Sequence, residues 1–263
     1  MGVTAVSGKK SQAERALREL RALILGGDLP PGGHVSETAA ADLIGISRTP
    51  MREAMAQLVD EGLLDRAPTG RCTVRSFSRE DIIDAIEFRG VLEGTVVRIA
   101  AERGADMARL TACRAVIDAI DAVLGSTEDD VDFDGYTRLN EDFHDHLARL
   151  SGSATLEREL MRAYRLPLAS PNAFLQSQAN VPAVRRSLFI AQAQHKAIIE
   201  AVAQREGARA EALAREHARL ARANLDHVIR DHQGLAGAIP GLSLVSHPTV
   251  DKTNTTSHPG RTS

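Results

Sequence analysis

Apolar residues recur at helical spacing over most of the chain, whereas the pattern typical of strands appears only near the amino end. From Ser78 onward the pattern predicts six helices that start near residues 78, 107, 133, 154, 184 and 208 and end near 104, 124, 150, 177, 205 and 232. The fourth helix, Ala154 to Ser177, contains Pro167 and Pro171 and is expected to break there. This part of the chain is therefore predicted to form an all-α bundle of six antiparallel helices.

Before the bundle, a helix is expected over residues 11–25, followed by two shorter helices that a tight turn joins. Ser36 is a suitable N-cap for the first short helix, and Gly45 can adopt the left-handed conformation that ends it. Ser47 caps the next helix, whose first turn contains Pro50, where a missing N–H does no harm. Apolar residues at helical spacing form the buried stripe of this helix: Met51, Ala54, Met55 and Leu58. A short strand, a Pro/Gly turn and a second strand ending near residue 74 complete a winged helix-turn-helix.

Polar side chains that suit DNA contact lie at the two exposed tips of this unit. Arg48, Thr49 and Arg52 project from the first turn of the second short helix, the part that a recognition helix presents to a major groove. Arginine can bind guanine or a phosphate through two hydrogen bonds, and Gly70 beside Arg71 would let a wing approach the DNA backbone closely. From the residues alone, a helix pair with solvated arginines is an equal alternative.

The run ISRTPMREAM, continued by EGLL and by a hairpin with Gly-Arg at its tip, resembles the winged helix of GntR-family transcription regulators. The resemblance implies that Arg48, Thr49 and Arg52 contact operator DNA, together with the wing Gly70 and the helix cap Ser36. Relatives often carry arginine where this chain has Thr38, so a contact at that place is expected to be weaker. The resemblance also implies a homodimer on a palindromic operator, since each winged helix reads one half-site.

The bundle carries a candidate metal site. Asn140 and His144 are four residues apart on the third helix, so both point the same way, while His195 and His217 lie beside apolar residues on the fifth and sixth helices. Three neutral imidazoles and one oxygen ligand suit a divalent ion such as Zn²⁺, Ni²⁺ or Mn²⁺. Because an inward histidine is usually a hydrogen-bonded core residue, the residues alone leave the core and metal interpretations about equal.

Residues 78–232 resemble the FCD domain, the helical effector-binding half of FadR-type GntR regulators. Its metal-binding branch has the pattern Asp-x-x-x-His followed by one histidine on each of two later helices, and here Asn140 replaces the aspartate. We therefore expect weaker metal binding, or a larger role for an anionic effector. The resemblance implies that Arg89 faces the cavity and binds a small organic acid; the alternatives are a solvated arginine or an ion pair with Glu93. Asn224, seven residues after His217, is a further candidate for the cavity wall.

Composition and charge limit these interpretations only slightly. The chain of 263 residues has a net charge of −3, and its first 77 residues carry ten Lys/Arg against nine acids, a net of +1. DNA affinity must then depend on local arginines and should fall steeply with salt. Two cysteines provide no disulfide framework, and no apolar run approaches the length of a membrane span, so we expect a cytoplasmic protein with no membrane partner.

The predicted organisation has four parts: a disordered leader (1–10), a winged helix-turn-helix DNA-binding domain (11–77), an all-helical effector- and metal-binding domain (78–232) and a disordered tail (233–263) rich in Gly, Ser, Thr and Pro. The predicted function is a ligand-responsive DNA-binding transcription regulator, most simply a repressor, that uses a divalent metal and a small organic acid. The alternatives are a metal sensor without an organic effector and a three-histidine metalloenzyme. The enzyme is disfavoured because no general base faces the histidines and the winged helix would have no use.

Overall fold

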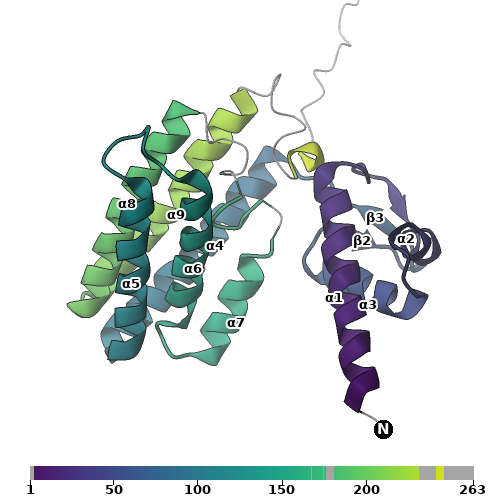
Figure 1. The fold of residues 1–263 in the computed structure, drawn as a ribbon, viewed down its shortest axis with the longest axis horizontal. Helices are drawn as coiled ribbons and strands as arrows, with labels where there is room; N and C mark the ends of the chain where they lie inside the picture. The colour runs from purple at the N-terminus through teal and green to yellow at the C-terminus, as the bar shows by residue number, and fades with distance from the viewer. Residues whose placement is uncertain (1–2, 167, 174, 176–180, 231–240, 246–263) are drawn as a thin grey trace, which may run out of the picture.

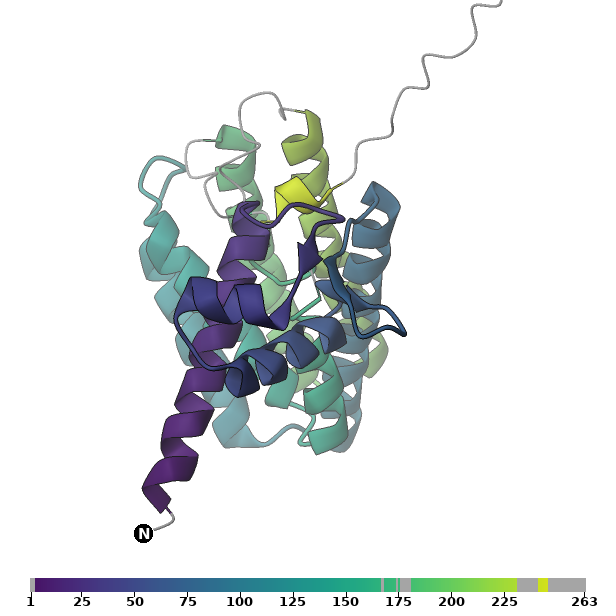
Figure 2. The ribbon, with the colours of Figure 1, turned by 90° about the vertical axis from the view of Figure 1, so that its right-hand side faces the viewer.

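The computed structural model describes residues 3–166, 168–173, 175, 181–230 and 241–245. It confirms the predicted fold class: a small winged helix lies beside a bundle of upright helices (Figure 1), and a quarter turn brings the winged helix in front of the bundle (Figure 2). Within the described residues, none of the helices combines the length and the apolar character that crossing a membrane would require.

Short helices and a three-stranded antiparallel sheet form the winged helix, with the strands in the order β1-β3-β2. The expected caps of its second helix are present: the Ser36 side chain accepts a hydrogen bond from the Ala39 N–H, and Gly45 has a φ of 71°. Ser47 occupies the next N-cap, but its side chain makes no capping hydrogen bond. In chain order the elements are α1 (Val3–Gly26), β1 (His34–Val35), α2 (Glu37–Ile44), α3 (Arg48–Asp60), β2 (Leu64–Arg66) and β3 (Cys72–Val74).

The start of helix α1 corrects the prediction of a disordered leader over residues 1–10, because the helix already begins at Val3. A physical reason is that helix growth adds one hydrogen bond per residue once a nucleus exists. The nucleus is anchored by Leu20 and Ile24, both fully buried, and the preceding residues contain no proline that would stop the helix. The sequence pattern also missed strand β1, since two residues are too few to show an alternation.

Six helices follow in the described part of the chain and form the bundle. The first of them begins with a capping box in which Ser78 and Asp81 each bond the other's backbone N–H. Helices α4 and α9 pack very closely at Gly90, where an added Cβ would lie 2.9 Å from the Cβ of Ala218. The six are α4 (Arg79–Arg103), α5 (Met107–Leu124), α6 (Phe133–Arg149), α7 (Ala154–Ala163), α8 (Pro182–Ala203) and α9 (Gly207–Arg230).

Helix α7 is much shorter than predicted, since it ends at Ala163 and not near Ser177. The two prolines explain the difference, because a residue that precedes proline is disfavoured in the helical conformation and proline itself donates no N–H. A non-helical segment follows, of which residues 168–173 are described without a gap. The predicted end at Ser177 lies outside the described residues, as does the predicted end of the last helix at His232.

A hydrophobic cluster joins the winged helix to the start of the bundle, so it crosses the predicted boundary near residue 77. It contains residues of α1, α2 and α3 together with Ile82 and Ile86 of α4, and Leu168 from the segment after α7. A second cluster fills the bundle itself and packs α5, α6 and α8 around Phe143, which is fully buried. Each large apolar side chain buried in this way contributes about 2 kcal/mol to folding.

Residues 241–245 correct part of the prediction that the whole carboxyl tail is disordered. They form a short 3-10 helix, η1 (Leu242–Leu244), which lies against the upper end of α1 in Figure 1. Leu242 and Leu244 are buried in the first hydrophobic cluster, and the Phe77 N–H donates to the Leu244 carbonyl at 2.8 Å. The leucines of the run Gly-Leu-Ser-Leu-Val, which lies within a polar tail, are thus buried against the core of the winged helix. The remainder of the predicted tail lies outside the described residues.

Candidate functional site

All six predicted DNA-contacting residues are exposed on the winged helix: Ser36, Arg48, Thr49, Arg52, Gly70 and Arg71. The side chains of Arg48 and Arg52 are 64% and 61% exposed, and both face the carboxylate of Glu37. The Arg52 Nε lies 3.2 Å from that carboxylate, whereas an Arg48 nitrogen lies 4.0 Å away. The two arginines predicted to contact DNA therefore share one acidic partner, which DNA phosphates would have to displace.

The tip of the wing is a tight turn that requires glycine. The Ala67 carbonyl accepts from the Gly70 N–H at 2.8 Å, and the Ala67 N–H donates to the Arg71 carbonyl at the same distance. Gly70 has a φ of 83°, a conformation that L side chains rarely adopt. The turn leaves Arg71 exposed at the end of the hairpin, where contact with a DNA backbone is sterically open.

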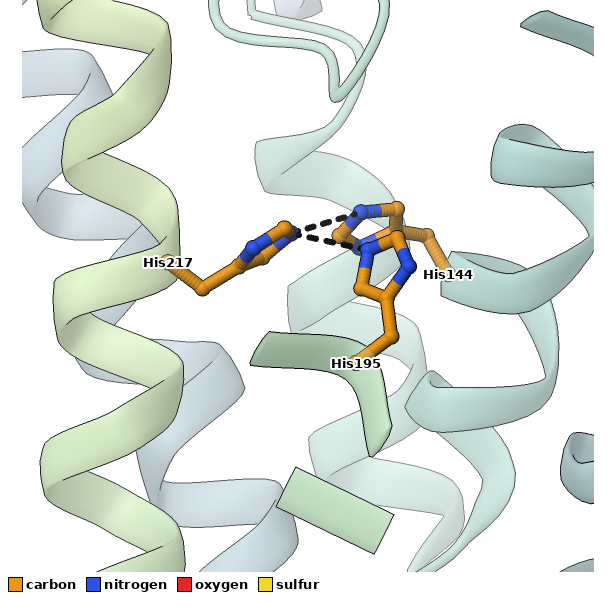
Figure 3. A group of neighbouring side chains, drawn as sticks. All are labelled: His144, His195 and His217. Atoms are coloured by element: carbon orange, nitrogen blue, oxygen red, sulfur yellow. Dashed lines mark hydrogen bonds between the residues drawn. The ribbon is translucent and has the colours of Figure 1, made fainter. Parts of the chain in front are cut away.

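The three predicted histidines meet inside the bundle (Figure 3). His144 comes from α6, His195 from α8 and His217 from α9, and all three are buried. The Nε2 atom of His217 lies 3.1 Å from Nε2 of His195 and 3.4 Å from Nε2 of His144. One ligand atom from each ring therefore lies within 4.8 Å of the other two.

The hydrogen bonds of Gln192 fix the tautomer of His195. The Gln192 amide nitrogen donates to the Ile117 carbonyl at 2.8 Å and to the Asp121 carboxylate at 2.9 Å, which uses both of its protons. Its Oε1 atom therefore faces His195 Nδ1, 3.2 Å away, and can only accept. The ring proton of neutral His195 must sit on Nδ1, which leaves a lone pair on Nε2.

Glu93 fixes the tautomer of His144 in the same way. A Glu93 oxygen lies 3.0 Å from His144 Nδ1 and also accepts from the Tyr164 hydroxyl at 3.0 Å. Burial by itself raises the pKa of Glu93, but Arg89 and His144 outweigh burial and lower it to about 2. The group is thus a carboxylate that accepts the Nδ1 proton, as in the carboxylate–histidine–metal arrangements of metalloproteins.

The third histidine also has a side-chain amide beside its outer nitrogen, because Oε1 of Gln194 lies 3.1 Å from His217 Nδ1. Burial, followed by His144, lowers the pKa of His217 to about 3, and burial with His217 and His144 lowers the pKa of His195 well below its usual value. With its proton on Nε2, His217 would donate to the Nε2 atoms of the other two rings; with its proton on Nδ1, toward Gln194, three lone pairs converge on one buried point. Such an arrangement is repulsive by itself, and a divalent cation would relieve the repulsion. The donor set therefore fits a first-row metal ion.

A small cavity of about 30 Å³ adjoins the histidines, and its wall includes the other predicted site residues, Asn140, Arg89 and Asn224. All three are buried, and Arg89 lies in ion-pair range of Glu93, the alternative that the sequence left open. Two Arg89 nitrogens donate to the carbonyls of Ala169 and Ala218, at 3.0 and 3.3 Å. Its Nε, like Oε2 of Glu93 3.9 Å away, has no hydrogen-bond partner. Since a cavity of this size holds about one or two waters, an organic acid could enter only if the wall moved.

The sequence did not reveal the residues that contact the outer ring nitrogens of the three histidines. The sequence pattern predicts Glu93 only as an ion-pair partner of Arg89 and assigns no role to Gln192 or Gln194. A signal was present for Gln192, because it precedes His195 by three residues and so shares its helix face. The contact of Glu93 with His144 joins α4 to α6 and has no counterpart in local spacing.

Comparison with known proteins identifies the class to which this architecture belongs. Residues 12–74 match the family of bacterial regulatory proteins called gntR, and residues 84–222 match the FCD domain. The chain belongs to the GntR family of DNA-binding transcription regulators and carries an FCD domain after its winged helix.

Relatives that are named regulators match this chain over different shares of its length. An uncharacterized HTH-type transcriptional regulator in an unstable DNA locus of Streptomyces ambofaciens is 32% identical over 217 residues, 76% of this chain and 79% of its own. The uncharacterized regulator YdhC of Bacillus subtilis is 28% identical over 142 residues, 54% of this chain and 62% of its own. A relative in Paenarthrobacter nicotinovorans, named a probable D-xylose utilization operon transcriptional repressor, is 39% identical over 75 residues, 28% of this chain and 33% of its own. The solved structure of E. coli McbR/YncC shares the fold, with a TM-score of 0.55 at 19% identity over 84% of this chain and 98% of that one.

Proposed function

We propose that this GntR-family regulator binds operator DNA under the control of a divalent metal ion held by His144, His195 and His217, with Asn140 as an oxygen ligand. The observation that carries the proposal is that the three imidazole rings each direct one nitrogen toward a common buried point. The other nitrogen of His195 faces the Gln192 side-chain oxygen, and that of His144 faces the Glu93 carboxylate. A bound cation would act as a Lewis acid that attracts the carboxylate of an effector. Zn²⁺, Ni²⁺ and Mn²⁺ all suit this donor set.

The charges around the cavity support a small organic acid as the effector. With Asn140 in place of an aspartate and neutral histidines, Glu93 is the one acid in contact with this histidine cluster among the described residues. Arg89 already offsets its charge, so a divalent ion would leave the site with an excess of positive charge. An anionic ligand restores the balance, and Arg89 and Asn224 on the cavity wall are its proposed partners.

On the DNA side, Ser36, Arg48, Thr49, Arg52, Gly70 and Arg71 are the proposed contacts, and two winged helices of a homodimer would read the two halves of an operator. Phe88 and Val91, which are 52% and 39% exposed on α4, offer an apolar surface for the second copy. The repressor name of one relative supports repression as the working mode. Because the operator is chromosomal, we place the regulator in the cytoplasm.

A metal sensor without an organic effector is the second candidate, favoured by the small size of the cavity. Titration of operator binding separates the two. If added Zn²⁺, Ni²⁺ or Mn²⁺ alone changes operator affinity, and small acids add nothing, the ion is the signal. If a chelator abolishes the response to an acid while DNA binding persists, the ion is a cofactor for the acid.

The central test measures metal content and operator affinity on matched variants. His195→Ala should lose bound metal in elemental analysis, whereas His146→Ala, a half-buried histidine on α6 outside the cluster, should keep it. Arg52→Ala should lose binding to duplexes selected by the wild-type protein, whereas Arg18→Ala on the exposed face of α1 should not. Unchanged metal stoichiometry in the first variant, or unchanged DNA affinity in the second, would refute the corresponding half of the proposal.

A further inference from the structure

Asn172, in the segment between α7 and α8, contacts the proposed metal ligand Asn140. The Asn172 amide nitrogen donates to the Thr137 carbonyl at 2.8 Å. Because a carbonyl only accepts, the orientation of the Asn172 amide is fixed and its Oδ1 must point elsewhere. That oxygen accepts from the amide nitrogen of Asn140 at 2.8 Å. The Asn140 amide is therefore oriented as well, and its Oδ1 is the atom left for the cavity, with the Tyr136 hydroxyl at 3.5 Å.

The same segment contacts the cavity at two further points. The carbonyl of Ala169, a fully buried residue, accepts from Arg89 at 3.0 Å. Pro171 forms part of the cavity wall together with Asn140 and Arg89. A ligand larger than a water or two could enter only if the cavity wall moved. The segment is part of this wall and is hydrogen-bonded to two other wall residues, Asn140 and Arg89.

On its other side the segment packs against the winged helix. Leu168 is buried in the hydrophobic cluster that contains the core of the DNA-binding domain. Its neighbourhood includes Leu25 of α1 and Gly241 before η1, since an added Cβ on Gly241 would meet the side chains of both leucines at 3.0 to 3.2 Å. Leu168 therefore packs the segment between α7 and α8 against the end of α1 and against the chain that leads into η1.

The backbone of Leu168 is held in an unfavourable state. Its φ is 59°, in the left-handed region that a leucine rarely occupies. Such a conformation persists only where surrounding contacts over-determine it, and it favours movement once those contacts change. A second cavity of about 470 Å³, lined by Leu17 and Leu25 of α1 and by Leu168 and Ala173, lies beside the segment and provides room for it to shift.

We infer that residues 168–173 transmit the occupancy of the metal cavity to the DNA-binding domain, with Asn172 as the positioning residue for Asn140 and Leu168 as the contact with α1. The inference rests on the proposed function, because it specifies how that site controls DNA binding. Two sites then share one bistable element, which is the physical requirement for coupling between them.

The test compares metal affinity and operator affinity in the full-length protein. Mn²⁺, Ni²⁺ and Zn²⁺ are titrated with and without an operator duplex, and the ratio of the two affinities gives the coupling factor. Couplings in allosteric proteins are commonly about 5- to 150-fold. Asn172→Ala should lower metal affinity about 10- to 100-fold, as for other residues that orient a ligand. Wild-type metal affinity in Asn172→Ala would overturn the positioning role.

Leu168→Ala should leave metal affinity within about twofold of wild type, because Leu168 does not line the metal cavity, while the coupling factor falls toward 1. Leu168→Gly serves as the second variant: it removes the same side chain as alanine and, because glycine accepts a φ of 59°, it also removes the backbone strain that alanine would keep. Leu150→Ala, which removes a buried leucine from the other hydrophobic cluster, controls for a general loss of packing.

The outcomes separate this inference from the proposed function. If wild-type protein binds no metal, or if metal leaves its operator affinity unchanged, the proposed function falls and this inference falls with it. If wild type shows coupling and both Leu168 variants retain it in full, only the inference is overturned. Loss of coupling in the Leu168 variants, with normal coupling in Leu150→Ala, supports it.

Discussion

At the scale of single residues, the outer hydrogen bonds of the histidines decide what the cluster can do. An imidazole presents a lone pair only on the nitrogen that carries no proton, and here Glu93 and Gln192 place the protons of His144 and His195 on the side away from the centre. His144 and His195 can therefore only accept at Nε2, either from a proton on His217 Nε2 or by binding a cation.

The depressed pKa values of His195 and His217 predict how the metal-free protein responds to acid. In the unfolded chain each imidazole binds a proton near pH 6.5, whereas the folded His217 does so only near pH 3. The unfolded state thus binds more protons below pH 6.5, and stability is lost as the pH falls from there toward 3. The loss should be roughly 1 kcal/mol per pH unit for each histidine.

Urea denaturation with EDTA at several pH values between 7.5 and 5 measures this loss. The carboxyl of Glu93 has a folded pKa of about 2, below its ordinary 4.5, so its stabilisation is present above pH 4.5 and does not change in this window. A free energy of unfolding that stays constant between pH 7 and pH 5 would contradict the buried, neutral state of the two histidines.

The acid between the recognition arginines predicts a gain of DNA affinity on its removal. Glu37→Gln should raise operator affinity several-fold at low salt, because Arg48 and Arg52 lose an intramolecular partner and a negative charge leaves the phosphate-facing surface. Fluorescence anisotropy across a salt series measures it. Asp42→Asn, an exposed acid on the same helix, is the matched control, and equal gains in both variants would show that only net charge matters.

At the scale of elements, most helix bounds follow from local signals, and the exceptions have identifiable causes. Helix α5 has the predicted bounds, because Asp106 caps it and Gly125 follows its last residue. For helix α7 the two prolines predict a break, but the path of the segment beyond it depends on contacts with Arg89 and Asn140. The pairing of α4 with α9 is likewise a tertiary outcome that local spacing does not encode.

The close approach of α4 and α9 predicts that Gly90→Ala destabilises the protein. In an exposed helix the change would stabilise by up to about 1 kcal/mol. Here the new Cβ would lie 2.9 Å from the Ala218 Cβ, so the helices must separate at a cost of about 1 to 3 kcal/mol. Thermal and urea denaturation measure the change, with Met107→Ala, at a residue that is 65% exposed, as the control. A rise in stability would show that the helices yield easily.

At the scale of the whole molecule, one hydrophobic cluster belongs to both halves of the chain. The winged helix shares its core with Ile82 and Ile86 of the bundle and with η1 at the far end of the described chain. Folding of the DNA-binding domain is therefore linked to segments more than 150 residues away, and any movement of the segment carrying Leu168 acts on that shared core.

Truncation of the returning leucines tests this linkage. Leu242→Ala and Leu244→Ala should each cost about 2 to 5 kcal/mol, because both side chains are buried. Hydrogen exchange should show the loss of protection first in α1, and later in α5 of the second cluster. Leu43→Ala, at a leucine that is 64% exposed, should change stability little. Equal loss in α1 and α5 would indicate that the two clusters unfold together.

The sequence by itself determined the helical fold class, the winged helix, its arginine-bearing tip and the three histidines, because each depends on spacing within one element or on a long contiguous motif. Tertiary structure alone decided that the histidines share one centre, that Glu93 and Asn172 orient His144 and Asn140, and that the carboxyl-terminal leucines return to the first helix. These contacts join residues far apart in sequence, and their positions follow from how whole elements pack, which no local pattern records.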